Sequence, residues 1–148
     1  MNSGQAIMTI IFDGRKFAKE KEEVLAAKAA GILKQGIKPK LASILIDNDP
    51  ASILYVSLKK KAAERIGIEV EILKYKNTKK VREDIEKLNK DKNVHGIMIQ
   101  LPLPKEFKKE TQELINLIAP EKDVDGLRVD SPYLPATVKA IIEIIKES

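Results

Sequence analysis

Chemically useful side chains recur along one face of a predicted helix, at Ser52, Tyr55 and Lys59. The helix covers residues 51–66, and at about 100° per residue the three side chains fall within roughly 60° of one another. Most charged residues of the helix gather on one arc, which we expect to face solvent: Lys60, Lys61, Glu64 and Arg65. Lys59 lies instead on the arc that we expect to face the protein, among apolar residues: Val56, Leu58, Ala62, Ala63 and Ile66.

The position of Lys59 has two interpretations. An ammonium held against an apolar face costs free energy unless it is paired or has a chemical role. In the first interpretation the lysine stem lies along the core and the ammonium reaches water, which is the common arrangement for a single lysine. In the second, partial removal from water prepares Lys59 to act as a general acid or base near neutral pH. The Ser-Tyr-Lys stripe adds weight to the second interpretation.

The composition bounds the class of protein. A chain of 148 residues with 43% apolar and 33% charged residues fits one soluble globular domain. The absence of cysteine excludes a disulfide framework and a thiolate metal site, and no metal-binding residues are predicted. No apolar run is long enough to cross a bilayer, and the first residues do not resemble a signal peptide. We therefore expect a cytoplasmic protein that does not bind membranes.

The net charge of +5 could favour an anionic ligand but does not identify one. A nucleic-acid-binding module is a weak alternative that rests on this charge alone. The three tyrosines and three phenylalanines are scattered rather than arranged as a stacking platform, so no nucleic-acid partner is expected.

The order of predicted elements indicates an α/β fold. Residues 41–46, 69–75 and 94–100 read as strands, and a helix occupies each gap between them. Successive βαβ units of this kind form a parallel sheet, so we predict a three-layer α/β/α domain. A short first strand is predicted at residues 7–12. The helix predicted at 15–34 ends before Gly36, and its inner residues are expected to be Phe17, Val24, Leu25 and Ile32.

Further helices follow from apolar periodicity. Thr78 is predicted to cap a helix with the inner stripe Val81, Ile85 and Leu88. The next helix is marked by Leu114, Ile115 and Ile118, and a last one follows Pro135 with the stripe Val138, Ile141, Ile142 and Ile145.

Gln100 and the Lys59 stripe should meet at one edge of this sheet. Ser52, Tyr55 and Lys59 follow the strand that ends at residue 46, and Gln100 is the last residue of another predicted strand. In open α/β sheets, ligands bind outside the carboxyl ends of the strands. The sequence therefore predicts a small-molecule site at this edge, without naming the molecule.

Several other chemistries find no support in the motifs. The glycines, at positions 4, 14, 31, 36, 67, 96 and 126, are too far apart for a dinucleotide fingerprint or a P-loop. His95 is the only histidine and is predicted as an ordinary strand residue, so a catalytic triad or zinc cluster is nearly excluded. Lysine, carboxylate, amide and tyrosine groups remain as reagents.

Three segments together resemble a known family. They are ASILYVSLKKKA at 51–62, GIMIQLPLP at 96–104 and PEKDVDG at 120–126. In order and separation they are similar to the signatures of bifunctional methylenetetrahydrofolate dehydrogenase/methenyltetrahydrofolate cyclohydrolase. The resemblance covers roughly residues 10–127. It implies that residues 1–127 are the folate-binding catalytic domain and that residues 128–148 are a linker and helix.

The resemblance also implies roles for individual residues. Lys59 matches the catalytic lysine, and Gln100 matches the glutamine that positions it. The substrate-binding residues are matched by four positions: Ser52 near the ligand, Tyr55 stacked on the folate ring system, Pro102 lining the pocket, and Asp125 holding the amino-pyrimidine edge of the pterin. On spacing alone, Asp123 and Asp125 would be read as a charged turn closed by Gly126.

The implied function is one-carbon folate metabolism with tetrahydrofolate as substrate and a lysine general acid/base. In the family a C-terminal Rossmann domain follows and binds NADP. Here the chain stops at Ser148, so we expect that domain to be absent, and no NADP site is recognised. The alternative function is a folate-binding domain without dehydrogenase activity of its own. The implied partners are the folate substrate and either a second copy of the chain or a separate Rossmann domain.

Overall fold

The computed structural model describes residues 12–147, and the strand predicted at 7–12 lies outside the described residues except for Phe12. The helices are α1 (Gly14–Lys34), α2 (Pro50–Arg65), α3 (Lys79–Lys90), α4 (Thr111–Leu117) and α5 (Ala136–Glu147), with two 3₁₀ turns, η1 (Lys105–Glu110) and η2 (Pro120–Lys122). The strands are β1 (Lys40–Ile46), β2 (Glu69–Tyr75) and β3 (Gly96–Ile99). Within residues 12–147, the predicted order of strands and helices is confirmed.

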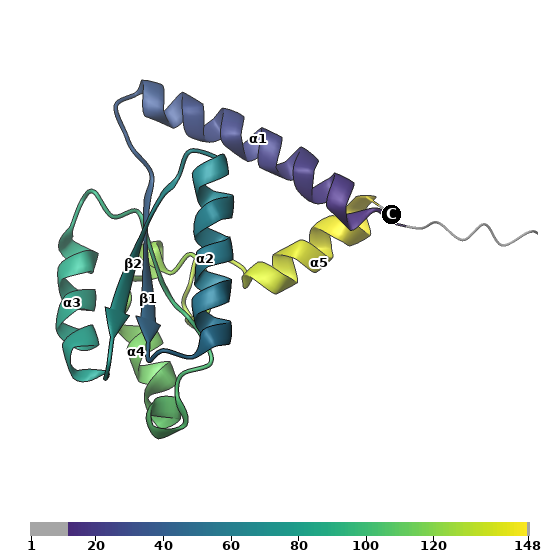
Figure 1. Cartoon of the computed structure of the whole chain (residues 1–148). Coiled ribbons are helices and arrows are strands. Elements are labelled where there is room, and N and C mark those ends of the chain that lie inside the picture. Colours follow the sequence, from purple (N-terminus) through teal and green to yellow (C-terminus); the bar gives the residue numbers. More distant parts are fainter. Residues whose placement is uncertain (1–11, 148) are drawn as a thin grey trace, which may run out of the picture.

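The sheet is parallel, with the strand order β2-β1-β3. Its central strand β1 is buried on both faces, as expected for a continuous apolar run: Ala42 and Ile44 are 0% exposed, and Leu45 is 1% exposed. Figure 1 shows α2 on one side of the strands and α3 on the other. The described residues therefore form the predicted three-layer α/β/α arrangement.

The main core lies between the sheet and the pair α3 and α4. It contains the alternate β1 residues Ala42, Ile44 and Ile46 together with Val81 and Ile85 from α3. Val81 and Ile85 are 0% exposed, and Leu88 packs against the cluster, so the stripe predicted for α3 is confirmed. The predicted stripe of α4 is buried as well: Leu114, Ile115 and Ile118. Thr78 occupies the N-cap of α3, but its side chain makes no capping hydrogen bond.

The prediction for the inner face of α1 is wrong. Val24, Leu25 and Ile32 are 54%, 47% and 40% exposed, and Phe17 is half-buried. Ala29 is the buried residue of this helix. In Figure 1, α1 leans away from the sheet toward α5, so the described elements leave most of its apolar face uncovered.

Ion pairs join α1 to α5. The Lys21 ammonium lies 2.9 Å from the Glu143 carboxylate and 3.7 Å from that of Glu147. The apolar stripe of α5 is largely open, because Val138, Ile141 and Ile145 are exposed and Ile142 is half-buried. Among residues 12–147, no helix is both long and apolar enough to span a membrane.

Candidate functional site

The candidate site lies at the carboxyl ends of β1 and β3. The two strands pair in parallel, so their ends meet at the same edge of the sheet. Gln100 follows β3 directly, and its N–H donates to the Ile44 carbonyl at 2.8 Å. A parallel bridge between Ile97 and Asp123 brings the segment that carries Asp125 beside β3. Residues distant in sequence thus converge on one edge.

The start of α2 is fixed by Asp49. Its carboxylate accepts a hydrogen bond from the Ser52 backbone N–H at 2.8 Å, and this bond holds the pKa of Asp49 below its usual range. Ser52 and Val56 are 7% and 1% exposed and form the part of the helix that faces the sheet. The N-cap therefore fixes where α2 starts, and the packing of Ser52 and Val56 sets the direction in which the Ser-Tyr-Lys stripe faces.

The predicted inward arc of α2 is only partly buried. Ala62, Ala63 and Ile66 are half-buried, whereas Tyr55 and Leu58 are 59% and 51% exposed, and Lys59 is also exposed. The expectation that Lys59 is desolvated by an apolar face is thus wrong in this structure. The reason is geometric, since the apolar arc is wider than the strip of helix that contacts the sheet. Lys59 lies beside that strip, and its side chain is exposed to solvent.

Lys59 and Gln100 are in contact. The Lys59 ammonium donates to Gln100 Oε1 at 3.3 Å, and Gln100 is 8% exposed. The other end of the amide is engaged, because Gln100 Nε2 donates to the Leu101 carbonyl at 2.7 Å. A lysine has no acceptor, so this second bond orients the amide with its oxygen toward the ammonium.

Asp125 interacts electrostatically with Lys59. Burial raises the pKa of the Asp125 carboxyl, the positive charge of Lys59 opposes that rise, and the negative charge of Asp123 adds to it. Asp125 is half-buried, and Asp123 is 1% exposed. A half-buried carboxylate can accept hydrogen bonds from paired N–H donors of a ligand.

A tight turn carries Asp125. The Gly126 N–H donates to the Asp123 carbonyl at 3.0 Å, and Gly126 has a φ of +65°. A Cβ at this position would lie 2.6 Å from the Leu134 carbonyl carbon. Only glycine combines the positive φ with that close approach of backbone.

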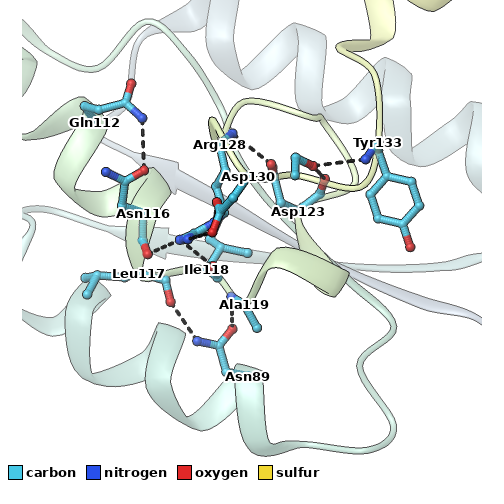
Figure 2. Close-up of polar contacts among 11 residues, drawn as sticks. Asn89, Gln112, Asn116, Leu117, Ile118, Ala119, Asp123, Arg128, Asp130 and Tyr133 are labelled. Carbon is cyan, nitrogen blue, oxygen red and sulfur yellow. Dashed lines mark hydrogen bonds and ion pairs between the residues drawn. The ribbon is translucent and has the colours of Figure 1, made fainter.

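The loop around this turn is attached to its neighbours by side chains that the sequence did not single out, Asn89 and Arg128. Asn89 donates to the Leu117 carbonyl at 2.7 Å and accepts from the Ala119 N–H at 2.9 Å. Arg128 donates through its backbone N–H to Asp123 at 2.9 Å and through its guanidinium to Asp130, as Figure 2 shows. No motif marks these residues, because their partners are mainly backbone carbonyls and a nearby aspartate. The hydrogen bonds of Arg128 also tie the chain beyond residue 127 to the loop.

Two cavities lie near the site. Ser52 and Pro102 line the first, of about 370 Å³, together with Asp49 and residues after β3. Tyr55, Lys59, Gln100 and Asp125 do not line it. The second, of about 540 Å³, lies between α5 and the segment around Tyr133, and it contains no site residue predicted from the sequence.

The strand-to-helix turn at this edge does not fit a dinucleotide. Pyrophosphate is held by glycine-rich turns whose N–H groups point at the phosphates. Here residues 47–50 read Asp-Asn-Asp-Pro, and the Asp49 carboxylate already occupies the first turn of α2. Two carboxylates at this turn would repel a pyrophosphate, so no chemistry through NADP is assigned to the described residues.

Comparison with known proteins points to one family. The model of the tetrahydrofolate dehydrogenase/cyclohydrolase catalytic domain matches residues 12–125. A bifunctional protein FolD from Macrococcus caseolyticus is 39% identical over 150 residues, covering 93% of this chain and 52% of that protein. The chain spans about half the length of the curated relatives it matches.

Solved structures give the same result. The bifunctional enzyme FolD, methylenetetrahydrofolate dehydrogenase/cyclohydrolase, from Campylobacter jejuni matches with a TM-score of 0.85 and 32% identity, over 91% of this chain and 52% of that one. A 5,10-methylenetetrahydrofolate dehydrogenase from the silkworm Bombyx mori matches with a TM-score of 0.84 and 34% identity, over 95% of this chain and 52% of that one.

Proposed function

The chain belongs to the tetrahydrofolate dehydrogenase/cyclohydrolase family, and from this premise we propose that it binds a reduced folate and acts in one-carbon metabolism. In this proposal the full reaction converts methylenetetrahydrofolate to the methenyl form and hydrolyses that form to formyltetrahydrofolate. The observation that carries the proposal is the contact between the Lys59 ammonium and Gln100 at the carboxyl edge of the sheet. This contact joins Lys59, the lysine of the predicted stripe, to the buried and oriented amide of Gln100.

The hydrolytic step suits these residues. A water molecule adds to the cationic methenyl carbon and loses a proton, and a carbon–nitrogen bond then breaks as the departing nitrogen gains a proton. Lys59 is placed to take the first proton and to return one to the departing nitrogen. Gln100 orients Lys59 without adding charge. The open side of α2 gives water access to the ammonium.

Recognition of the folate falls to the other residues. Tyr55 is exposed on the same face of α2 and offers its ring for stacking. Asp125 accepts N–H donors from the amino-pyrimidine edge of the pterin. Ser52 and Pro102 line the neighbouring cavity and bound the ligand on that side.

The dehydrogenase step is proposed only for a protein that supplies a nicotinamide site. A second candidate function, a folate-binding domain without dehydrogenase activity of its own, is favoured by the acidic turn at residues 47–50. Calorimetric titration of NADP into this chain separates the two. Tight NADP binding would contradict the second candidate.

Substitution of Lys59 tests the hydrolytic proposal. We expect Lys59→Met to lower the turnover of methenyltetrahydrofolate hydrolysis by about 100-fold or more, the usual contribution of a general acid or base. The matched control is Lys60→Met, since Lys60 is the next residue of α2 and its ammonium lies 3.8 Å from Glu64. Hydrolysis by Lys59→Met at the rate of the control would remove Lys59 from the mechanism.

A further inference from the structure

Arg128 connects the two ends of the loop that carries Asp125. Its guanidinium donates to both carboxylate oxygens of Asp130, at 2.7 and 2.8 Å, just beyond the loop. The same guanidinium donates to the Ile118 carbonyl at 3.0 Å and to the Asn116 carbonyl, where the chain enters the loop (Figure 2). The side chain is 14% exposed. One residue therefore joins the entrance of the loop to its exit.

The loop is anchored a second time through the backbone of the same residue. The Arg128 N–H donates to the Asp123 carboxylate at 2.9 Å, and Asp123 is paired with Ile97 beside the sheet. The Asp123 carbonyl in turn accepts hydrogen bonds from Gly126 and from Ser131. The turn that carries Asp125 thus lies between anchors that meet at Arg128.

Asp125 depends on this backbone for its position. Within residues 12–147, no hydrogen bond holds the Asp125 carboxyl itself, although the charges of Lys59 and Asp123 act on it. The place of that carboxyl is consequently set by the loop. The guanidinium of Arg128 joins the two ends of this loop, while the Lys122 ammonium ties its middle to the Leu88 carbonyl at 2.7 Å.

We propose that Arg128 is a positioning residue of the folate site, holding in place the loop that carries Asp125. The inference rests on the proposed function, because it assigns Asp125 to the pterin edge. An arginine suits this role, since its planar guanidinium offers five donors in a fixed fork and can bind carbonyls and a carboxylate together. A lysine at position 128 offers a compact point charge that cannot span the same partners.

The first test measures the loop without any folate. Amide hydrogen exchange is followed in the intact protein, in Arg128→Gln and in Arg128→Lys. We expect exchange at residues 119–127 to become faster in Arg128→Gln, less so in Arg128→Lys, and to stay unchanged in α2. The matched control is Arg82→Gln, because Arg82 also joins two elements through carboxylates, Glu110 and Glu113, but away from this loop. Equal exchange in Arg128→Gln and the control would overturn the positioning role.

The second test measures binding of 5,10-methenyltetrahydrofolate by calorimetry in a double-substitution cycle. Arg128→Gln should raise the Kd about tenfold, the usual scale for losing charge-assisted hydrogen bonds that order a site. In an Asp125→Asn background the same substitution should change the Kd less than about twofold, because the positioned group is already lost. An equal loss in both backgrounds would overturn the proposal.

Two further readouts keep the outcomes distinct. Circular dichroism identifies a variant that does not fold. If Arg128→Gln does not fold, hydrogen exchange and folate binding are measured on Arg128→Lys instead. Failure of the unsubstituted protein to bind the folate would overturn the proposed function. The exchange experiment would still decide whether Arg128 holds the loop.

Discussion

The two sides of the candidate site are built in different ways. On the α2 side, Lys59 is exposed and donates one hydrogen bond of 3.3 Å to Gln100. On the loop side, Asp123 is 1% exposed, and the turn around Asp125 is fixed by Arg128 and Gly126. One side is a long, exposed side chain, and the other is a short side chain on a constrained backbone.

This difference matches the two jobs that the site is proposed to do. A group that transfers protons must come within hydrogen-bond reach of the reacting atoms, which a long, exposed side chain can do. A group that recognises a ligand gains from being held in place before the ligand arrives, because less ordering remains to be done on binding. The structure therefore separates reactivity from recognition by the support that each side chain receives.

The largest effect is expected from Gly126→Ala, which alters the constrained turn beside Asp125. The new Cβ would lie 2.6 Å from the Leu134 carbonyl carbon at a positive φ, so we expect the free energy of unfolding to fall by at least about 2 kcal/mol. Urea denaturation measures the change.

A second glycine provides the matched control. Gly31 is in α1, where an added Cβ meets nothing within 4 Å, and alanine there should add about 0.5–1 kcal/mol of stability. If both substitutions shift stability in the same direction, the account of the turn at Gly126 is incorrect.

A smaller effect is expected from Gln100→Met, on the α2 side of the site, because Gln100 is the partner of Lys59. The substitution removes the acceptor for Lys59 and the donor to the Leu101 carbonyl. We expect kcat for methenyltetrahydrofolate hydrolysis to fall about tenfold while KM changes less than about threefold, since orientation is lost and recognition is kept. Steady-state kinetics on Gln112→Met, which loses only a 3.0 Å bond to Asn116 on α4, serve as reference. A change confined to KM would assign Gln100 to recognition instead.

The smallest effect concerns the pH dependence of stability. Burial raises the folded pKa of Asp125 above its usual value, so between the usual and the raised value the folded state binds more protons than the unfolded state. Stability contributed by this group is thus lost as pH rises through that window, and the deficit persists above it. Asp125→Asn should remove the deficit, making the protein more stable at pH 7 by less than about 1 kcal/mol after solvent screening.

Thermal melts between pH 3 and pH 7 measure this effect, with the exposed Glu86→Gln as control. A melting temperature of Asp125→Asn that falls relative to the unsubstituted protein as pH rises would reverse the sign and contradict the account.

Sequence patterns predicted the elements better than their surroundings. The continuous apolar run at β1 implied a strand covered on both faces, and Ile44 is 0% exposed. The apolar positions of α1 were identified as well, but Val24 and Leu25 are exposed, because periodicity identifies an apolar face without showing what covers it. Lys59 was placed on the correct side of α2 and assigned the wrong burial for the same reason.

The loop side was the least accessible to prediction. The DVDG segment at 123–126 was recognised by resemblance, and the roles given to Lys59, Gln100 and Asp125 remain predictions. Arg128 and Asn89 escaped notice, since hydrogen bonds to backbone carbonyls leave no pattern of residue types in the sequence.

Folate binding by variants that alter one side of the site at a time tests the central claim most directly. Calorimetry with 5,10-methenyltetrahydrofolate is compared for the unsubstituted protein, Lys59→Met and Asp125→Asn. The account predicts that Lys59→Met binds within about threefold of the unsubstituted protein, whereas Asp125→Asn binds about tenfold more weakly or worse. Normal binding by Asp125→Asn together with lost binding by Lys59→Met would contradict it, because recognition would then reside on α2.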